Sequence, residues 1–245
     1  MCKDIAFIYN YLENIKTFNL IVHFLIPAAG SGSRMKAGKN KLLIDLEGDS
    51  LIYWTLKSVF SASSINWVGI IGQPKDKELL LNSAKEFADI VHWINGGETR
   101  QQSVFNGLNA LPKDAEKVLI HDGARCLINP ELIDLCAKQL DENEAVILAT
   151  KVTDTIKIVD NEGFIKETLD RNYLWAAQTP QGFLVDRLKK AHKMAIDKNW
   201  KVTDDASLFE MLNWKVKIIE GTYSNIKITS PLDLKIAKLF VKNPS

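Results

Sequence analysis

The sequence predicts an α/β fold: a Rossmann-like, mostly parallel sheet with helices on both faces and a projecting β-hairpin arm. Three observations predict it. Short β-branched apolar runs alternate with segments of helical spacing from about residue 21 to residue 149. Glycine-rich or polar clusters follow several of these runs, as is typical where ligands bind beyond the carboxyl ends of parallel strands. Residues 151–178 break the alternation with a period of two.

The alternating part of the chain divides into strands and helices in a regular order. Strands are expected at 21–26, 67–71, 90–94, 118–121 and 145–149, and helices at 51–60, 76–87, 99–111 and 130–140. Ser50 and Thr99 are expected to cap their helices, and Pro130 to open the fourth. Because each helix separates two strands, the strands are expected to run parallel with helices on both faces of the sheet.

Residues 153–159 and 164–169 each alternate apolar and polar side chains, with the turn-forming sequence Asp160-Asn161-Glu162-Gly163 between them. This pattern predicts a β-hairpin. Its faces are half polar and no helix covers it, so we expect a projecting arm, about residues 151–173, whose Ile and Phe side chains need a partner. The remainder predicts a helix at 184–196, a helix to 212 capped by Thr203, a strand at 215–220, a strand-like stretch at 225–229 and a helix from Pro231 to about 241.

The composition excludes several classes of protein. The 245 residues carry a formal net charge of +1, which gives no basis for binding nucleic acid or an acidic membrane surface. No apolar run approaches the roughly 18 residues of a membrane helix, so we expect a soluble protein. Three scattered cysteines indicate a reducing compartment, and none of the four histidines suggests catalysis or zinc binding.

We expect a single domain at 21–245 preceded by an extension at 1–20. The extension carries Asp4 and Glu13 and lacks a cleavage site, so secretion is not expected. It could be an extra helix or an upstream start-codon extension. We expect a cytoplasmic protein, with a plastid location left open.

The segment from Pro27 to Lys41 directly follows the first apolar run and predicts a phosphate-binding loop. Its glycines allow backbone amides to approach an anion, and Arg34, Lys39 and Lys41 can neutralise charge. The spacing fits neither the dinucleotide fingerprint nor the Walker loop, because Met35 stands where the first needs glycine and Asn40 where the second needs Ser or Thr. A nucleophile elbow is also excluded. A surface turn rich in Gly and Lys remains the alternative.

Two further clusters follow predicted strands. Gly96 and Gly97 lead into a helix start, where a glycine pair admits a flat base close to the backbone, although a turn with a cap is the simpler alternative. Asp122 follows the fourth strand, and a carboxylate facing a polyphosphate is repulsive unless it binds a cation or hydroxyl groups. Asp122 is therefore a candidate site residue, with an Asp-Gly turn as the alternative.

These segments resemble the sugar-nucleotide pyrophosphorylases, and within that group the 2-C-methyl-D-erythritol 4-phosphate cytidylyltransferase family. The resemblance covers about residues 21–239 and rests on Gly30-Ser31-Gly32-Ser33-Arg34-Met35, Gly96-Gly97-Glu98 with Arg100 and Ser103, His121-Asp122-Gly123-Ala124-Arg125, Asp170-Arg171-Asn172-Tyr173-Leu174-Trp175 and Asn225-Ile226-Lys227-Ile228-Thr229. Cys126 replaces the proline common in the family, which removes a rigid turn but no chemical group.

The resemblance implies that the chain joins CTP and 2-C-methyl-D-erythritol 4-phosphate, releasing pyrophosphate. It implies catalytic roles for Arg34, Lys41, Asp122 and Lys227. It implies nucleotide binding by Pro27, Ala28, Ala29, Gly30, Ser31, Gly32, Gly96, Gly97, Glu98, Ser103 and Gly123. Sugar-phosphate binding is implied for Arg125, Thr155, Arg171, Thr179, Thr203 and Lys227, with Thr155 and Arg171 on an arm that clasps a second subunit of a homodimer.

The implied reaction needs no general base. A phosphomonoester is mostly a dianion at pH 7 and can attack the α-phosphorus of CTP directly, which leaves the protein with positioning and electrostatic work. Magnesium is the expected cofactor, held mainly by the CTP phosphates with Asp122 nearby. Two alternatives stay open: a ribitol-5-phosphate cytidylyltransferase, and a nucleotide-binding regulatory protein without turnover.

Overall fold

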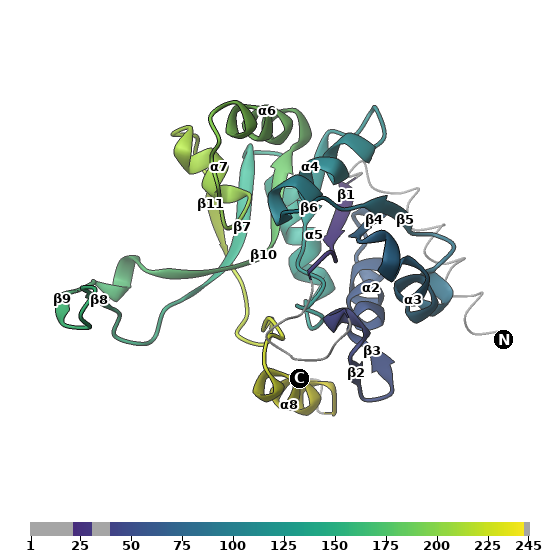
Figure 1. Cartoon of the computed structure of the whole chain (residues 1–245), viewed down its shortest axis with the longest axis horizontal. Helices are drawn as coiled ribbons and strands as arrows, with labels where there is room; N and C mark the ends of the chain where they lie inside the picture. Colours follow the sequence, from purple (N-terminus) through teal and green to yellow (C-terminus); the bar gives the residue numbers. More distant parts are fainter. Residues whose placement is uncertain (1–21, 31–39, 243–245) are drawn as a thin grey trace.

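The computed structural model describes residues 22–30 and 40–242 and is built on a twisted seven-stranded sheet (Figure 1). In spatial order the strands are β11 (Lys217–Glu220), β7 (Ala145–Lys151), β10 (Trp175–Leu184), β6 (Lys117–Ile120), β1 (Val22–Pro27), β4 (Ile65–Gly72) and β5 (His92–Asn95). All neighbours pair in parallel except β10, which is antiparallel to both β6 and β7. The predicted α/β class with a mostly parallel sheet is confirmed.

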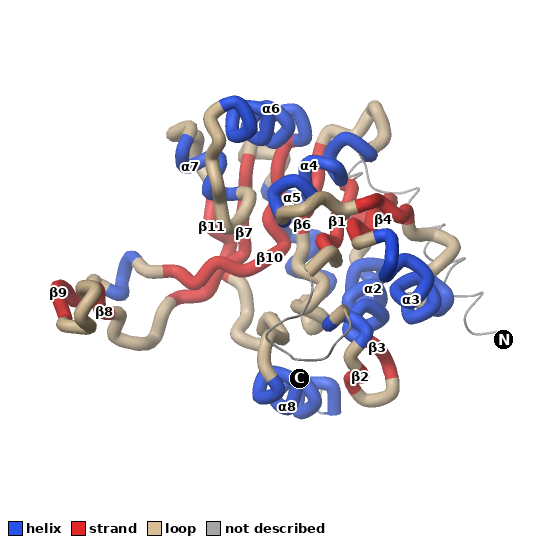
Figure 2. Tube along the Cα trace, in the orientation of Figure 1, coloured by secondary structure: helices blue, strands red, loops and turns tan. Residues whose placement is uncertain are grey.

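Helices cover both faces of the sheet, as the blue segments in Figure 2 show. One core packs against α2 (Leu51–Ser61), α3 (Lys77–Ser83), α5 (Pro130–Gln139) and α8 (Pro231–Lys242). The other packs against α4 (Arg100–Ala110), α6 (Val185–Asp197) and α7 (Ala206–Met211). Strands β1, β4, β6 and β7 lie between the two cores and are mostly buried, which agrees with their runs of apolar residues.

Local sequence signals set the helix starts as expected. The hydroxyl of Ser50 accepts a hydrogen bond from the backbone N of Tyr53 (3.2 Å) at the start of α2, and Thr99 caps α4 by accepting from Gln102 N (3.0 Å). Pro130 occupies the first turn of α5, where its missing N–H costs nothing. Helix α4, which carries Ser103, therefore begins where the sequence predicts, as do α2 and α5.

The prediction of one helix over residues 76–87 is wrong in its extent. The chain forms a 3₁₀ turn at Pro74–Asp76, the short helix α3, and a second 3₁₀ turn at Lys85–Phe87. Lys85 has φ of +54°, a left-handed conformation that ends an α-helix. Its ammonium contacts Asp49 on the small hairpin of β2 (Asp45–Leu46) and β3 (Asp49–Ser50), so a contact distant in the sequence accompanies the break.

The part of the chain after residue 170 differs from the prediction in three places. Strand β10 was not predicted, and it inserts antiparallel between β6 and β7 with a register irregularity between Ala177 and Gln181. The stretch 225–229 is irregular rather than strand-like, because Ile228 N donates to Ala124 O (2.8 Å) instead of joining the sheet. Thr203 does not cap a helix, since α7 starts three residues later and Ser207 N donates to the carboxylate of Asp204 (3.1 Å).

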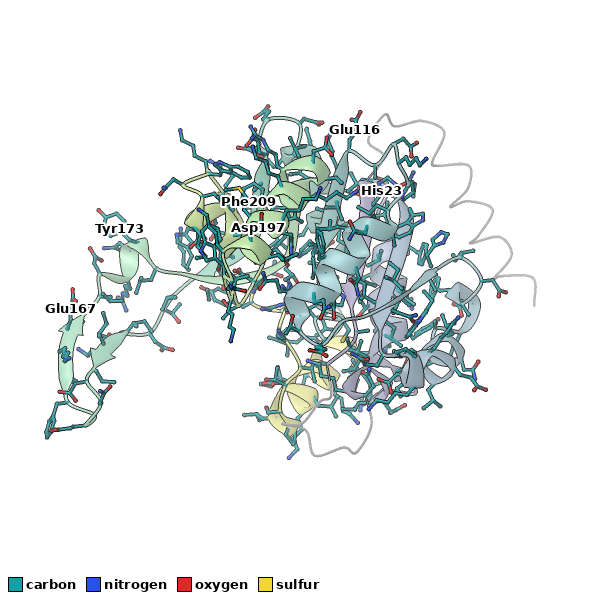
Figure 3. All side chains as sticks on the ribbon, turned by 45° about the horizontal axis from the view of Figure 1, so that its top comes forward. His23, Glu116, Glu167, Tyr173, Asp197 and Phe209 are labelled. Atoms are coloured by element: carbon teal, nitrogen blue, oxygen red, sulfur yellow. The ribbon has the colours of Figure 1, made fainter. Side chains whose placement is uncertain are left out.

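The predicted hairpin arm is confirmed. Strands β8 (Lys157–Val159) and β9 (Ile165–Thr168) pair antiparallel at the tip of two extended segments that lead away from the sheet (Figure 1). Tyr173 and Glu167 mark the arm in Figure 3. Phe164 and Ile165 are 67% and 64% exposed, so apolar side chains of the arm are not covered by their own chain.

Several predictions lie outside the described residues. They are the extension at 1–20, the site residues Ser31, Gly32 and Arg34, and the loop cation Lys39. Among the helices that are described, none has both the length and the apolar character required to cross a membrane.

Candidate active site

A pocket opens where β1, β5 and β6 end, because parallel strands bring their following loops to one edge of the sheet. It is lined by Pro27, Ala28, Ala29, Gly30, Asn40, Lys41, Leu42, Arg100, Ser103, Asp122, Gly123, Ala124 and Lys227. All of these except Asn40, Leu42, Arg100 and Ala124 are residues that the sequence analysis assigns to the site. Segments that lie far apart in the sequence therefore meet in one cavity.

Asn40 fixes the end of the glycine-rich loop to its beginning. Its side-chain amide donates to the carbonyl of Ala28 (2.7 Å) and to the carboxylate of Asp76 (3.0 Å), while its carbonyl oxygen accepts from Leu42 N (3.1 Å). Asn40 is buried, so these bonds are protected from water. They hold Lys41 at the pocket wall. In the sequence, Asn40 is notable only because it stands where a Walker loop needs the hydroxyl of Ser or Thr. Its role in fixing the loop was not predicted.

Gly96 packs directly against the loop that follows β1, and Gly97 packs against the side chain of Gln102. A Cβ atom on Gly96 would lie 3.0 Å from Ala29 Cβ and 3.2 Å from Ser103 Oγ, so only glycine fits without a shift of its neighbours. The Ser103 hydroxyl accepts from Gly97 N (3.0 Å) and donates to the carbonyl of Thr99 (2.8 Å). Ser103 thus shapes the glycine pair, and it also lines the pocket.

Gly123 is constrained in the same way on the other side of the pocket. A Cβ atom there would lie 2.8 Å from a methyl carbon of Leu42 and 3.0 Å from one of Ile26. The buried hydroxyl of Thr55 donates to the Gly123 carbonyl (2.8 Å). The Asp122-Gly123 segment is therefore pressed against the core, which turns the preceding carboxylate toward the pocket.

Asp122 and Lys227 form an ion pair inside the pocket, with 2.7 Å between Lys227 Nζ and Asp122 Oδ2. Burial alone would raise the pKa of Asp122, but the charge and hydrogen bond of Lys227 and the charge of Arg100 hold it below its usual value. Asp122 is 15% exposed and ionised at neutral pH. With Lys41 and Arg100, the described lining residues carry three cationic side chains against one carboxylate, which favours an anionic ligand.

The contacts of Arg125 join parts of the protein to one another. Its guanidinium donates to the carbonyls of Asn225 (2.7 Å) and Ala177 (3.3 Å), and it lies 3.9 Å from Asp122. These contacts join the β6 loop to β10 and to the segment that carries Lys227. Thr179, buried on β10, accepts from Asp122 N (3.0 Å). Both residues lie behind the predicted site residues rather than among the described residues lining the pocket.

The other described residues predicted for the site do not line this pocket; they are the sugar-phosphate contacts Thr155, Arg171 and Thr203 and the nucleotide contacts Gly96, Gly97 and Glu98. Thr155 and Arg171 are exposed on the arm, where Arg171 donates to the carbonyl of Thr153 (2.9 Å). Thr203 is exposed ahead of α7, and Glu98 is exposed beside the glycine pair, where its N–H donates to Gln102 (3.0 Å).

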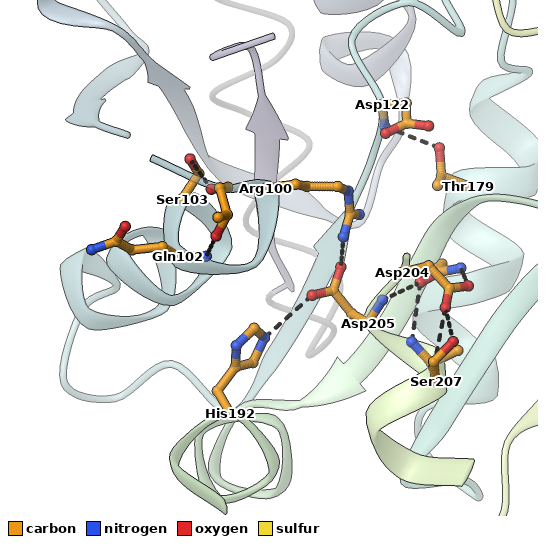
Figure 4. Close-up of polar contacts among 12 residues, drawn as sticks. Arg100, Gln102, Ser103, Asp122, Thr179, His192, Asp204, Asp205 and Ser207 are labelled. Atoms are coloured by element: carbon orange, nitrogen blue, oxygen red, sulfur yellow. Dashed lines mark hydrogen bonds and ion pairs between the residues drawn. The ribbon is translucent and has the colours of Figure 1, made fainter. Parts of the chain in front are cut away.

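Sequence reasoning also missed Arg100, although it lies within one of the motifs. Figure 4 shows its guanidinium directed at Asp205, with 2.8 Å between Arg100 Nη1 and Asp205 Oδ2. A signal was present, because an arginine in the first turn of a helix, opposed to the helix dipole, calls for a nearby anion.

The described part of the pocket offers few side chains that could bind a metal ion. Within residues 22–30 and 40–242, no cluster of three or more His, Cys, Asp or Glu side chains could hold a metal by itself. Among the described residues that line the pocket, Asp122 supplies the carboxylate. Such a set fits magnesium, which commonly uses one or two carboxylates and completes its shell with substrate phosphates and water.

Comparison with known proteins gives one consistent answer. The family model described as 2-C-methyl-D-erythritol 4-phosphate cytidylyltransferase matches residues 22–243. A protein of that name from Prochlorococcus marinus strain MIT 9301 is 94% identical over 223 residues, which are 91% of this chain and 100% of the relative. Another, from Prochlorococcus marinus strain NATL2A, is 56% identical over 217 residues, which are 89% of this chain and 96% of the relative.

Solved structures agree in fold as well as in sequence. A 4-diphosphocytidyl-2C-methyl-D-erythritol synthase from Anaerococcus prevotii superposes with a TM-score of 0.81 at 32% identity, covering 91% of this chain and 99% of that one. The 2-C-methyl-D-erythritol 4-phosphate cytidylyltransferase from Thermus thermophilus gives a TM-score of 0.74 at 28% identity, covering 90% and 98%.

Proposed function

Because the chain belongs to the 2-C-methyl-D-erythritol 4-phosphate cytidylyltransferase family, we propose that it transfers the cytidylyl group of CTP to 2-C-methyl-D-erythritol 4-phosphate. The products are 4-diphosphocytidyl-2-C-methyl-D-erythritol, an intermediate of non-mevalonate isoprenoid synthesis, and pyrophosphate. The observation that carries the proposal is the pocket at the ends of the parallel strands, which is lined by Lys41, Arg100 and Lys227 together with the carboxylate of Asp122.

The chemistry requires positioning and charge stabilisation. The phosphate dianion of the sugar alcohol attacks the α-phosphorus of CTP, a P–O bond forms, and the bond to pyrophosphate breaks with its electron pair leaving on oxygen. Negative charge grows on the non-bridging oxygens of the five-coordinate α-phosphate, where Lys41 and Arg34 stabilise it. Lys227, held by Asp122, neutralises phosphate on the other side of the pocket.

The glycine pair is the proposed cytosine site. We place a pyrimidine against Gly96 and Gly97, where the backbone could read the 4-amino group of cytosine and where a pocket built around the glycine pair would be overfilled by a purine. CTP should therefore be used in preference to UTP, ATP and GTP. Competition assays test this directly, and equal turnover with ATP would remove the assignment of the glycine pair to the base.

Magnesium is the proposed cofactor, bound chiefly through the CTP phosphates. Asp122 is the residue that would hold it, and when bound the ion would neutralise triphosphate charge. Activity that survives complete removal of divalent ions with a chelator would contradict this assignment.

We propose a homodimer in which each arm reaches the partner's active site. Val159, Phe164 and Ile165 on the arm are exposed and need a covering surface. Thr155 and Arg171 lie on the same arm, outside their own pocket. Pairing by a two-fold axis would cover both arms at once and supply these two side chains to the partner's sugar phosphate.

A cytoplasmic location is proposed as well. Cys126 and Cys136 are free and buried, and burial raises the pKa of each thiol to about 12, so both stay protonated and unreactive. Fractionation of the native cells with an antibody against the chain would test the location.

The assay that tests the function offers CTP and magnesium with either 2-C-methyl-D-erythritol 4-phosphate or ribitol 5-phosphate and measures pyrophosphate. The relatives' names favour the first substrate. Release of pyrophosphate only with ribitol 5-phosphate would replace the proposed substrate, and release with neither would refute the transferase activity.

A further inference from the structure

Arg100 is placed to contact a ligand as well as Asp205. It is the first residue of α4, lines the pocket with Ser103 and Asp122, and has a side chain that is 31% exposed. A guanidinium has five N–H donors in a rigid fork, and the contact with Asp205 involves Nη1. Further donors are thus available on a side chain that borders an anion-favouring pocket.

Asp205 is an unusual partner because it is almost completely buried. Its side chain is 1% exposed and contacts His192 Nε2 through Oδ1 (3.2 Å) and Arg100 through Oδ2 (2.8 Å). Its backbone N–H donates to the side-chain oxygen of Gln181 (3.2 Å), which lies on β10. Asp205 is therefore held by three elements, β10, α6 and α4, as Figure 4 shows for the side-chain contacts.

Stability alone does not account for this arrangement. Burial would raise the pKa of Asp205, and the charge of Arg100 with the contact to His192 lowers it below the usual value, so the carboxylate is charged. Removing a charge from water is costly, and well-packed apolar side chains often replace a buried ion pair without loss of stability. The ion pair fixes the orientation of the Arg100 guanidinium at the pocket wall, which apolar side chains could not do.

We propose that Arg100 is a further CTP-binding residue, donating to an oxygen of the triphosphate, and that Asp205 is the positioning residue that aims its guanidinium. The inference rests on the proposed function, since it names a contact to the same nucleotide.

The test compares CTP binding by calorimetry in the purified protein and in three variants. Arg100→Lys keeps the charge but loses the fork, and should raise the Kd for CTP about tenfold, the loss of one charge-assisted contact. Asp205→Asn should raise the Kd about fivefold in the wild-type background. In the double variant, Asp205→Asn should add little to the effect of Arg100→Lys, because it acts through Arg100.

The matched control is Arg187→Lys. Arg187 forms a pair of similar length with Glu144 (2.6 Å) but is partly exposed on α6 and does not line the pocket. The Arg187→Lys variant should leave the Kd for CTP unchanged. Circular dichroism and the Tm report folding separately, so a purely structural role would lower the Tm of Asp205→Asn and Arg100→Lys without changing the Kd of the folded protein.

Two results are decisive. If folded Arg100→Lys binds CTP as tightly as wild type, the proposal is overturned, whatever the Asp205 variant does. If Asp205→Asn fails to fold, Asp205→Glu takes its place, and an unchanged Kd there overturns the positioning role. Failure of the proposed function is a separate outcome, because it is measured on wild type by the release of pyrophosphate with 2-C-methyl-D-erythritol 4-phosphate and not by the Kd for CTP.

Discussion

The hydroxyl of Thr179 lies 3.0 Å from Nδ1 of His121, and both side chains are buried directly behind the pocket. The other ring nitrogen of His121, Nε2, is 3.1 Å from the carbonyl oxygen of Arg125, which can only accept a hydrogen bond. Nε2 therefore carries the proton, and Nδ1 accepts from Thr179. Thr179 in turn accepts from the backbone N–H of Asp122 (3.0 Å), so a directed chain of hydrogen bonds fixes the Asp122 backbone.

Thr179→Val should break this chain while preserving the shape of the side chain. It leaves Asp122 N–H and His121 Nδ1 without their partner, and the free energy of unfolding should fall by about 2 kcal/mol or more. Thr179→Ser keeps the hydroxyl and should lose clearly less. Urea denaturation measures both, and a valine variant as stable as wild type would show that these bonds contribute nothing.

The pH dependence of stability should carry a contribution from His121. Burial lowers the pKa of His121 to about 4, against about 6.5 in the unfolded chain. Well above pH 6.5 both states are neutral and the full stability is present. As the pH falls toward 4, the unfolded state binds a proton that the native state does not, so stability falls, by about 2.5 kcal/mol between pH 7.5 and 4.5.

His121→Gln should remove that part of the pH dependence, measured as the free energy of unfolding at the two pH values. His92→Gln is the control, because His92 is exposed and stacks on Trp67. Burial also lowers the pKa of His23, whose contribution remains in both variants. An unchanged pH profile in His121→Gln would mean that folding does not lower the pKa of His121.

Lys41→Ala and Arg34→Ala should lower kcat much more than CTP affinity. The proposed contacts strengthen only as charge builds on the α-phosphate, so we expect losses of about 100-fold or more in turnover. Steady-state kinetics with separate CTP titrations makes the distinction. Variants that keep near-wild-type turnover and lose only affinity would rule out the transition-state role.

The shared active site can be tested by mixing two inactive variants. Arg171→Ala damages the arm and Lys41→Ala damages the pocket, so a heterodimer would hold one doubly damaged site and one intact site. Unfolding and refolding the two together should restore roughly a quarter of wild-type activity if chains pair at random. Each variant refolded alone is the control.

The result depends on proof that subunits exchange, which differently tagged chains provide. Co-purification of the tags without recovered activity would mean that Arg171 serves its own chain. The arm would then be a dimer clasp and nothing more.

The parts of the fold that depend on neighbouring residues could be predicted from the sequence. Ser50 and Thr99 cap their helices through contacts to residues in the first turn, and the apolar strands are recognisable because both of their faces are buried. The Asp122 and Gly96–Gly97 positions follow from the rule that ligands bind beyond parallel strand ends.

The parts of the fold and of the site that depend on contacts between residues far apart in the sequence could not be predicted. Strand β10 contains Gln178, Pro180 and Gln181, and it is a strand because β6 and β7 pair with it from both sides. Asn40 and Arg100 gain their roles from Ala28 and Asp205, which lie 12 and 105 positions away in the sequence. No local pattern reveals such partners.

The most direct test of the central claim follows the phosphorus atoms of CTP. With 2-C-methyl-D-erythritol 4-phosphate and magnesium, label at the α-phosphorus should appear in a new organic diphosphate and label at the γ-phosphorus in pyrophosphate, with no such transfer to ribitol 5-phosphate. Label that stays in CTP, or an α-label that appears only in CMP, would contradict cytidylyl transfer to the sugar phosphate.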